Sequence, residues 1–229
     1  MVLALAGVAV AATTDPNVAI DPADQAWADS IVLTGADLGK GWSAERVPPE
    51  SDPEGTTDDS SGCPEGIPDE SDLTITGAAG PPGFNRGDSS VASAAIIWQT
   101  ADQASADWER WTTAMPAFIK CLSGLFTGTV AGLRVTVTGN AAVTAFAGAA
   151  PRVSAYRIKI VFQPPARRKK KAKPLIAYFD FILFGAGRAF GLAFMESFSP
   201  KPLTLAYERS LIAKMAARMA NDPAAVPAP

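Results

Sequence analysis

The sequence predicts an α+β fold with a single antiparallel β-sheet of about six strands and helices on both of its faces. Three observations indicate this fold. Helical periodicity occurs before, between and after groups of strand-like segments, without a strict alternation of helix and strand. Several strand-like segments follow one another through short turns, and strands joined in this way pair antiparallel. Nearly all of these segments are apolar on both faces, so each face of the sheet needs a covering layer.

The chain has 229 residues, of which 48% are hydrophobic and 19% are charged, as in globular proteins. We expect a signal-peptide-like segment over residues 1–12, a single α+β domain over 13–222 and a disordered Pro/Ala tail over 223–229. The first segment is an apolar run that ends in the plausible cleavage box Ala9-Val10-Ala11. It lacks a basic start and is too short to span a bilayer as a helix. A buried N-terminal helix or strand is the alternative.

The first part of the domain is expected to contain a short helix, a long loop and two strands. The helix is placed from Pro22 to Leu33, because Asp21 can cap it and proline is favoured at the first helical position. Residues 44–72 form a long acidic loop rich in proline, glycine and serine. Alternating apolar residues predict one strand over 72–77, and an apolar run predicts an interior strand over 90–100.

Two helices in succession are expected next. Thr100 and Gln103 form a capping box, and an apolar stripe at helical spacing follows them. Pro116 is expected to end this helix or to begin the second one. The second apolar stripe includes Cys121 and ends at the glycines that follow it.

The remainder of the domain is expected to be mostly sheet, closed by a helix. Strand-like segments occur at 132–139, 153–163, 174–184 and 188–198, with a shorter possible strand at 142–148. Glycines at 185 and 187 predict a tight hairpin between the last two strands. The terminal helix presents an apolar stripe made by Tyr207, Leu211, Ile212, Met215 and Met219.

Two cysteines are the best indicators of the compartment. Cys63 lies in the acidic loop and Cys121 on the inward face of a helix. An even cysteine pair in an exported chain predicts a disulfide, and two free buried thiols are the alternative. There is no C-x-x-C motif, so the disulfide is expected to be structural rather than catalytic.

Charge is unevenly distributed along the chain. Ten acidic residues and one basic residue lie between Glu45 and Asp72, whereas fourteen basic and three acidic residues lie between Arg152 and Met219. Either the chain meets an anionic partner, or the two regions face each other and cancel. The net charge of −3 argues against a generic nucleic-acid binder.

The most concentrated charge lies at the tip of a predicted β-hairpin. It comprises Arg167, Arg168, Lys169, Lys170, Lys171 and Lys173. One interpretation is an anion-binding finger for a membrane surface or an anionic envelope polymer. Nucleic acid is disfavoured, because no aromatic residues are interleaved to stack on bases. The alternative is a solvated loop whose charge only aids solubility.

Few residues are candidates for lining a ligand pocket. Trp98, Trp108 and Trp111 either line an apolar ligand site or belong to the core. The chain has no histidine, which removes the commonest general base and metal ligand, and we expect no metal and no cofactor. No nucleophile elbow, P-loop or dinucleotide-binding fingerprint is found.

Asp180 is an acid within an apolar strand. It either pairs across the hairpin with Arg157 or Lys159, or lies as a carboxylate in an open pocket. Only an unpaired Asp180 in an open pocket would favour a carboxylate-dependent hydrolase. Glu196 is out of register with Asp180, so a site with two carboxylates is not supported.

The order of elements resembles a diffuse group of small exported actinobacterial proteins. The resemblance rests on DLGKGW, the acidic loop with Cys63, SDLTITGAA, the strand ending at Trp98, the helix with Cys121, the paired strands and the terminal helix. The group includes PsbP-like proteins, extracellular sensor domains of kinases and mycobacterial LpqN-type lipoproteins. The resemblance covers about residues 23–220. It implies a PsbP-like sandwich and a non-enzymatic extracytoplasmic role.

Kinase sensor domains of this type commonly carry two disulfides and follow a transmembrane helix and a kinase, which this sequence does not show. A direct signalling role is therefore not implied. We expect a secreted ligand-binding or sensor-like protein of the cell envelope, without catalytic activity. Its ligand is expected to be a small amphiphile in a cleft between helix and sheet, or an anionic polymer at the basic hairpin tip. The alternatives are the hydrolase and an accessory partner-binding protein, which an exposed apolar patch would favour.

Overall fold

The structure is a computed structural model, and it describes residues 15–44, 63, 67–80, 83–130, 133–165 and 173–225. The signal-peptide-like segment and most of the acidic loop lie outside the described residues. So do Arg167, Arg168, Lys169, Lys170 and Lys171 of the basic hairpin tip, whereas Lys173 is described and exposed.

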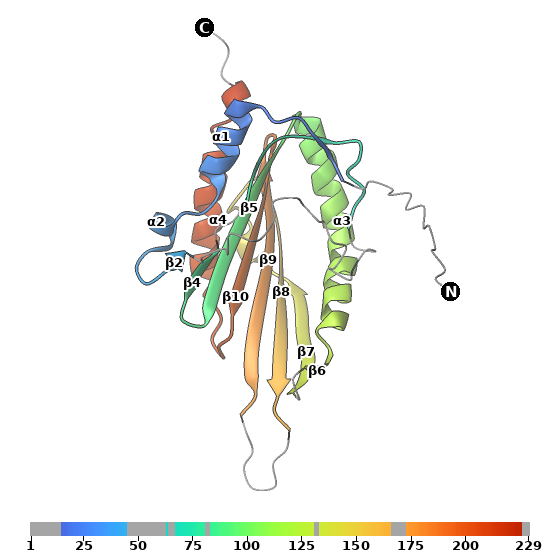
Figure 1. Ribbon diagram of the computed structural model, residues 1–229, viewed down its shortest axis with the longest axis vertical. Helices are drawn as coiled ribbons and strands as arrows, with labels where there is room; N and C mark the ends of the chain where they lie inside the picture. Colours follow the sequence, from blue (N-terminus) through green and yellow to red (C-terminus); the bar gives the residue numbers. More distant parts are fainter. Residues whose placement is uncertain are drawn as a thin grey trace, which may run out of the picture.

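A large sheet of ten strands forms the middle of the molecule (Figure 1). Its path is β1-β3-β5-β10-β9-β8-β7-β6, and β4 joins the same edge of β5 as β3 and pairs with β2. The six long strands are β3 (Thr74–Ala79), β5 (Ser89–Trp98), β7 (Leu133–Ala142), β8 (Arg152–Gln163), β9 (Leu175–Ala186) and β10 (Ala189–Ser197). All six were predicted from the sequence.

The predicted count of about six strands is wrong, because four short strands extend the sheet. They are β1 (Asn17–Val18), β2 (Ser43–Ala44), β4 (Phe84–Arg86) and β6 (Gly128–Val130). Each has only two or three residues, which is too short for alternation of apolar and polar residues to be seen. The sheet is also not purely antiparallel, since β1 pairs with β3 in parallel.

The register of the β8–β9 hairpin decides between Arg157 and Lys159, the two partners that the sequence left open for Asp180. Arg157 lies directly opposite Asp180, and Val153 lies opposite Phe184. A hairpin of two long strands fixes its register through the apolar pattern, because a slip of one residue would turn every side chain to the other face.

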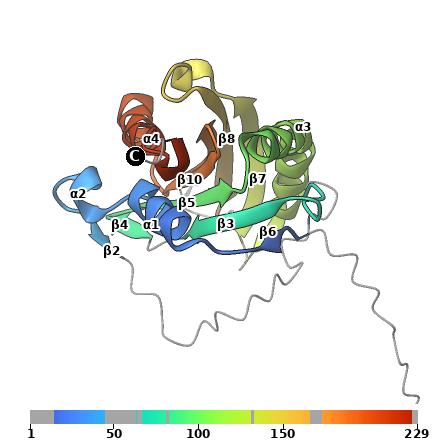
Figure 2. The same ribbon diagram turned by 90° about the horizontal axis from the view of Figure 1, so that it is seen from above.

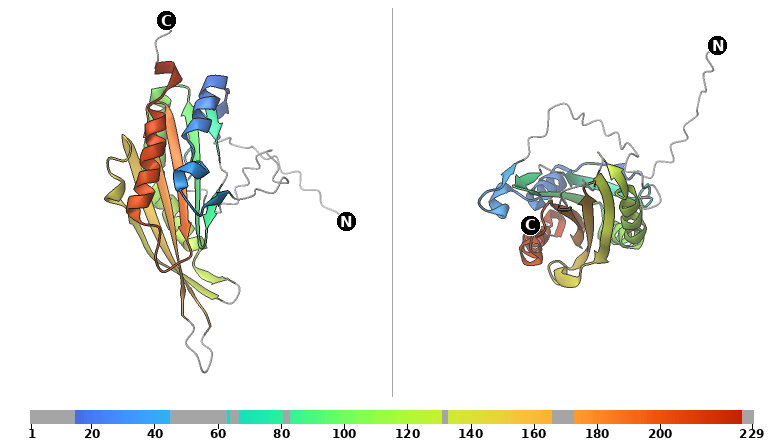
Figure 3. Two further views of the ribbon diagram at one scale, coloured as in Figure 1. Left: turned by 90° about the vertical axis from the view of Figure 1, so that its left-hand side faces the viewer. Right: turned by 90° about the horizontal axis from the view of Figure 1, so that it is seen from below.

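Helices cover both faces of the sheet, as predicted. Helices α1 (Pro22–Ile31) and α4 (Leu205–Met219) lie on one face, and α3 (Ala101–Leu125) lies on the other (Figure 2). Each face has its own cluster of buried apolar side chains. In Figure 3 the left view shows α4 running along the strands, and the view from below shows α4 and α3 on opposite sides of the sheet. The mixed α+β class is confirmed, whereas the PsbP-like arrangement is not.

Helix α3 is continuous, so the expected break at Pro116 is wrong. Pro116 lies on the exposed side of the helix, while Met115 and Ile119 on either side of it are buried in the same core. Packing of both halves against one sheet face therefore outweighs the backbone hydrogen bond that proline removes. No helix of the described part of the chain is long and apolar enough to cross a membrane.

Two short segments also differ from expectation. Residues 142–148 do not form a separate strand. Instead Ala142 ends β7, and Thr144–Phe146 form a 3₁₀ turn that buries Phe146. Pro223–Ala225, which were assigned to the disordered tail, also form a 3₁₀ turn.

The predicted disulfide is present between Cys63 and Cys121. It joins residues separated by 58 positions and fixes Cys63, whose side chain is fully buried, against α3. The end of the acidic loop is therefore held beside one face of the sheet.

Replacing both Cys63 and Cys121 by serine should lower the free energy of unfolding by about 4 kcal/mol, because the unfolded chain regains the entropy of an unclosed loop. Urea denaturation of the oxidised protein and the double variant measures the difference. An unchanged midpoint would contradict the constraint, and mass spectrometry with and without reductant checks that the parent protein is oxidised.

Helix α1 packs unusually close to β3 at Gly77. A Cβ atom at this position would overlap the backbone of Asp24 and Gln25. Gly77→Ala should therefore lower the free energy of unfolding by about 1–3 kcal/mol through overpacking. Gly80→Ala is the matched control, since the space beside Gly80 is open, and it should change stability by less than about 0.5 kcal/mol. Equal effects of the two substitutions in urea denaturation would refute the close packing.

Candidate functional site

An apolar cavity of about 220 Å³ lies between α3 and the sheet. Trp111, Met115 and Phe118 line it from α3, and alternate residues of β5, β9 and β10 line it from the sheet. The sheet residues are Ala94, Ile96, Phe181, Leu183, Phe190 and Leu192. Glu70 is the one charged residue among the described lining residues.

The cavity continues along the sheet as an apolar groove. A second hollow of about 160 Å³ shares Ala94 and Leu192 with the first and extends to Ala92 and Phe194. These four side chains remain partly exposed, although they lie in the middle of the sheet. The described helix on this face, α3, therefore leaves part of the apolar surface of β5 and β10 uncovered. We call this surface, made by Ala92, Ala94, Leu192 and Phe194 together with the cavity, the α3-side groove.

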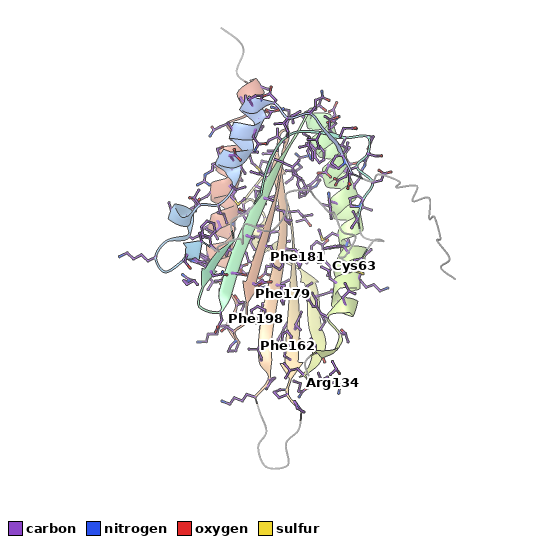
Figure 4. The ribbon with its side chains drawn as sticks, viewed as in Figure 1. Cys63, Arg134, Phe162, Phe179, Phe181 and Phe198 are labelled. Atoms are coloured by element: carbon purple, nitrogen blue, oxygen red, sulfur yellow. A yellow bond between two sulfur atoms is a disulfide. The ribbon has the colours of Figure 1, made fainter. Side chains whose placement is uncertain are left out.

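Aromatic residues extend the same face beyond the groove. Phe181, Phe179, Phe198 and Phe162 follow one another down the sheet in Figure 4. Ring centroids are 5.9 Å apart between Phe179 and Phe198, and 6.5 Å apart between Phe162 and Phe198. Phe198 is 38% exposed, so this end of the apolar face is open to solvent.

Glu70 is held at the cavity by two neighbours on α3. The indole Nε1 of Trp111 donates to Glu70 Oε1 at 2.5 Å. Arg110 forms a two-pronged ion pair with Asp72 and also donates to the backbone oxygen of Asp69. The disulfide at Cys63 and these bonds together fix the segment that carries Glu70 along α3.

Asp107 forms a buried acidic pair with Glu70. Its side chain is fully buried, and the indole Nε1 of Trp98 donates to Asp107 Oδ2 at 3.0 Å. Asp107 Oδ1 is buried and has no hydrogen-bond partner among the described residues, although a carboxylic acid could donate a proton to a neighbouring acceptor.

Burial and the closeness of two acids favour a proton shared between Glu70 and Asp107. Burial, followed by the nearby charge of Glu70, raises the pKa of Asp107 to about 8. Burial also raises the pKa of Glu70. Two carboxylates in a poorly solvated place cannot both ionise cheaply. A single proton held between the two carboxyl groups would relieve both the cost of burial and the repulsion between like charges.

The three predicted pocket tryptophans have different positions. Trp111 lines the cavity. Trp98 is fully buried below it, and Trp108 packs edge-on against Phe190 with centroids 6.3 Å apart. Trp98 and Trp108 thus belong to the core, and Trp111 alone of the three reaches the described cavity lining.

Asp180 does not belong to this site. It faces the other side of the sheet, toward α4, and Arg157 binds both of its oxygens at 2.6 and 2.8 Å. The same guanidinium reaches Glu208 of α4 at 3.1 Å. The cross-strand ion pair is therefore present. Asp180 was expected as a pocket candidate together with Trp98, Trp108 and Trp111, and this is wrong because strand residues alternate between faces.

Glu208 is a second buried acid that the sequence analysis missed. It is fully buried, and burial together with the charge of Asp180 raises its pKa to about 8. Asp107 and Glu208 share one detectable signal: each is an acid inside the apolar stripe of its helix, beside Trp108 and Leu211 respectively. Glu70 has no comparable signal, because it is one of many acids in the acidic loop.

Comparison with known proteins does not assign the chain to a family. No family model matches the chain, and no curated protein matches it. Among solved structures, the chain is similar to the extracellular domain of PknH from Mycobacterium tuberculosis. The two are 12% identical, the match covers 89% of this chain and 100% of that one, and the TM-score is 0.44. No inference about function is drawn from a similarity of this degree.

Stability should fall as pH rises from about 4 to about 8. Asp107 has a pKa of 3.8 when unperturbed and about 8 in the folded protein, so the folded state holds a proton that the unfolded chain releases across this window. Each such group contributes a slope of up to about 1.4 kcal/mol per pH unit. Asp107→Asn mimics the protonated acid and should make the slope shallower.

Urea denaturation at several pH values measures this slope. Glu208 contributes in the same direction, so Asp107→Asn should remove only part of it. Glu109→Gln is the matched control, because Glu109 is exposed on the same helix. A slope that is the same in Asp107→Asn as in the unmodified protein would show that Asp107 is ionised in the fold.

Proposed function

We propose that this chain is an extracytoplasmic protein that binds a small amphiphile in the α3-side groove and does not act as an enzyme. The observation that carries the proposal is an apolar cavity beside α3 with one charged lining residue among those described. Ligand sites are typically concave, mainly apolar and supplied with a few placed polar groups. The arrangement matches the amphiphile expected between a helix and the sheet.

The extracytoplasmic part of the proposal is supported by the disulfide. Cys63 and Cys121 are joined, and structural disulfides persist in oxidising compartments rather than in the cytosol of most organisms. The link also has a consequence for the groove, because it anchors the segment that brings Glu70 to the cavity.

The non-enzymatic part rests on the placement of the acids. Asp180, the carboxylate on which the hydrolase alternative depended, is buried against Arg157. In Asp107 and Glu70 the charge is shared within a pair and fixed by indole donors. Neither arrangement sets a general acid opposite a separate base across an open cleft, which hydrolysis of a glycosidic bond requires.

The anionic polymer considered as a second ligand would bind at the basic hairpin tip. Five of its six basic residues lie outside the described residues. The groove therefore carries the proposal alone.

Filling the cavity should abolish binding. Ala94 lines both hollows and is half-buried, so Ala94→Phe should occupy the space with little strain elsewhere. We expect the protein to enhance the fluorescence of N-phenylnaphthylamine, a neutral apolar dye, and the variant to bind it at least about tenfold more weakly. Ala117→Phe, on the exposed side of α3, is the control and should bind like the parent. Equal affinity in both variants, or no enhancement with the parent, would refute the proposed site.

A further inference from the structure

The acidic pair gives the groove a polarity that an apolar cavity alone lacks. Glu70 lines the cavity, and Asp107 lies directly behind it without contributing to the described lining. The walls around them are apolar side chains, with no described cation among the lining residues. A ligand in the cavity would thus meet hydrocarbon on most sides and a carboxylate at one end.

Charged residues near this end are predominantly acidic. Asp15, Asp69 and Asp72 lie near Glu70 or next to it in the chain, and two cations oppose them. Arg110 is engaged by Asp72 at 2.6 Å. Arg152 of β8 is attracted electrostatically to Asp107. Its hydrogen bonds, however, go to the backbone oxygens of Ala104 and Gly187.

The buried state of Asp107 is an independent observation. Its side chain has no exposed surface, and Oδ1 lacks a donor when the group is ionised. One of its oxygens accepts from the buried indole of Trp98, and the other is left without a partner at a cost in free energy. Glu70 lies close enough to Asp107 for its charge to raise the pKa of that acid, and Glu70 itself lines the cavity.

We propose that the ligand of the groove is a cationic amphiphile, with an ammonium or similar group at Glu70 and an apolar tail along β5 and β10. This inference rests on the proposed function and adds the charge of the head group to it. A cation next to the pair would favour the doubly ionised form of Glu70 and Asp107. The ammonium keeps its own proton, and the proton shared by the pair passes to the solvent.

Two alternatives have less support. An anionic head would lie against Glu70 with no cation in the described lining. A purely apolar ligand would leave the negative charge of the pair at the wall of a filled cavity, where water can no longer reach it. Charge complementarity therefore selects the cation.

Three probes with the same tail test the inference: n-octylammonium, n-octanol and n-octanoate. Calorimetric titration of the unmodified protein at neutral pH should give the tightest binding for octylammonium, by about tenfold over octanol. Octanoate should bind most weakly. Titration in buffers of different ionisation enthalpy should show release of up to about one proton with octylammonium and none with octanol.

Glu70→Gln removes the charge while keeping an oxygen that accepts from Trp111. It should weaken octylammonium binding by about tenfold and leave octanol within about twofold. Asp102→Asn, at an exposed acid on the first turn of α3, is the matched control and should leave all three affinities unchanged. Circular dichroism confirms that each variant is folded, and the comparison of head groups on the unmodified protein does not depend on any variant.

The outcomes separate this inference from the proposed function. If the three probes bind equally and Ala94→Phe blocks them all, the cationic head group is refuted and the groove remains the binding site. If octylammonium binds best but Ala94→Phe leaves its affinity unchanged, the cation binds elsewhere and the inference is refuted. If no probe binds the unmodified protein, the proposed function fails and this inference fails with it.

Discussion

The central strands of this protein are apolar on both faces, and the rest of the structure follows from the need to cover them. Strands β5, β9 and β10 present buried side chains to α1 and α4 on one side and to α3 on the other. Burying apolar surface stabilises the fold by about 25 cal/mol for each Å². Both faces of such a sheet therefore need a covering layer. On the α4 side the cover is complete enough to bury Ala95, Ile97 and Met195. On the α3 side the covering layer is incomplete.

This shortfall links the architecture to the groove. A single helix of α-helical width cannot cover strands from β7 to β5, and the half-exposed side chains of Ala94, Ile96 and Leu192 mark the part it leaves. The disulfide fixes Cys63 of the acidic loop on α3, and Trp111 of the same helix holds Glu70 at the cavity. The polar group of the cavity, Glu70, therefore comes from a loop and its apolar walls come from regular elements. Rigid walls with a loop-borne polar contact are a common arrangement of ligand sites.

Buried charge is handled differently on the two faces. On the α4 side, Arg157 joins Asp180 and Glu208 and so connects β8, β9 and α4. Arg188 similarly ties Asp24 of α1 to Asp222 near the C-terminus. These groups have cationic partners and lie in the packed core. On the α3 side, Glu70 and Asp107 accept from two indole donors, and no described cation forms an ion pair with either acid. The first arrangement is explained by structure alone, whereas the second suits a ligand.

Local pattern in the sequence is enough to predict most of the regular elements and the covalent link between the cysteines. The six long strands, the terminal helix and the disulfide follow from periodicity and from cysteine count. A cross-strand partner for Asp180 was also expected, although Arg157 and Lys159 were both left open. The buried acids Asp107 and Glu208 were missed, although each lies within an apolar helical stripe.

Contacts between residues far apart in the chain depend on the packing of the whole fold. Short strands such as β1 and β6 exist because a neighbouring strand offers hydrogen-bond partners, and two residues carry no pattern of their own. Pro116 is helical because both halves of α3 pack on one surface. Asp180 and Trp111 lie on opposite faces because the layer order assigns α4 to one and α3 to the other. Glu70 reaches Asp107 across a long separation in the chain, and contacts of this kind are set by packing energy summed over the whole fold rather than by any local sequence preference.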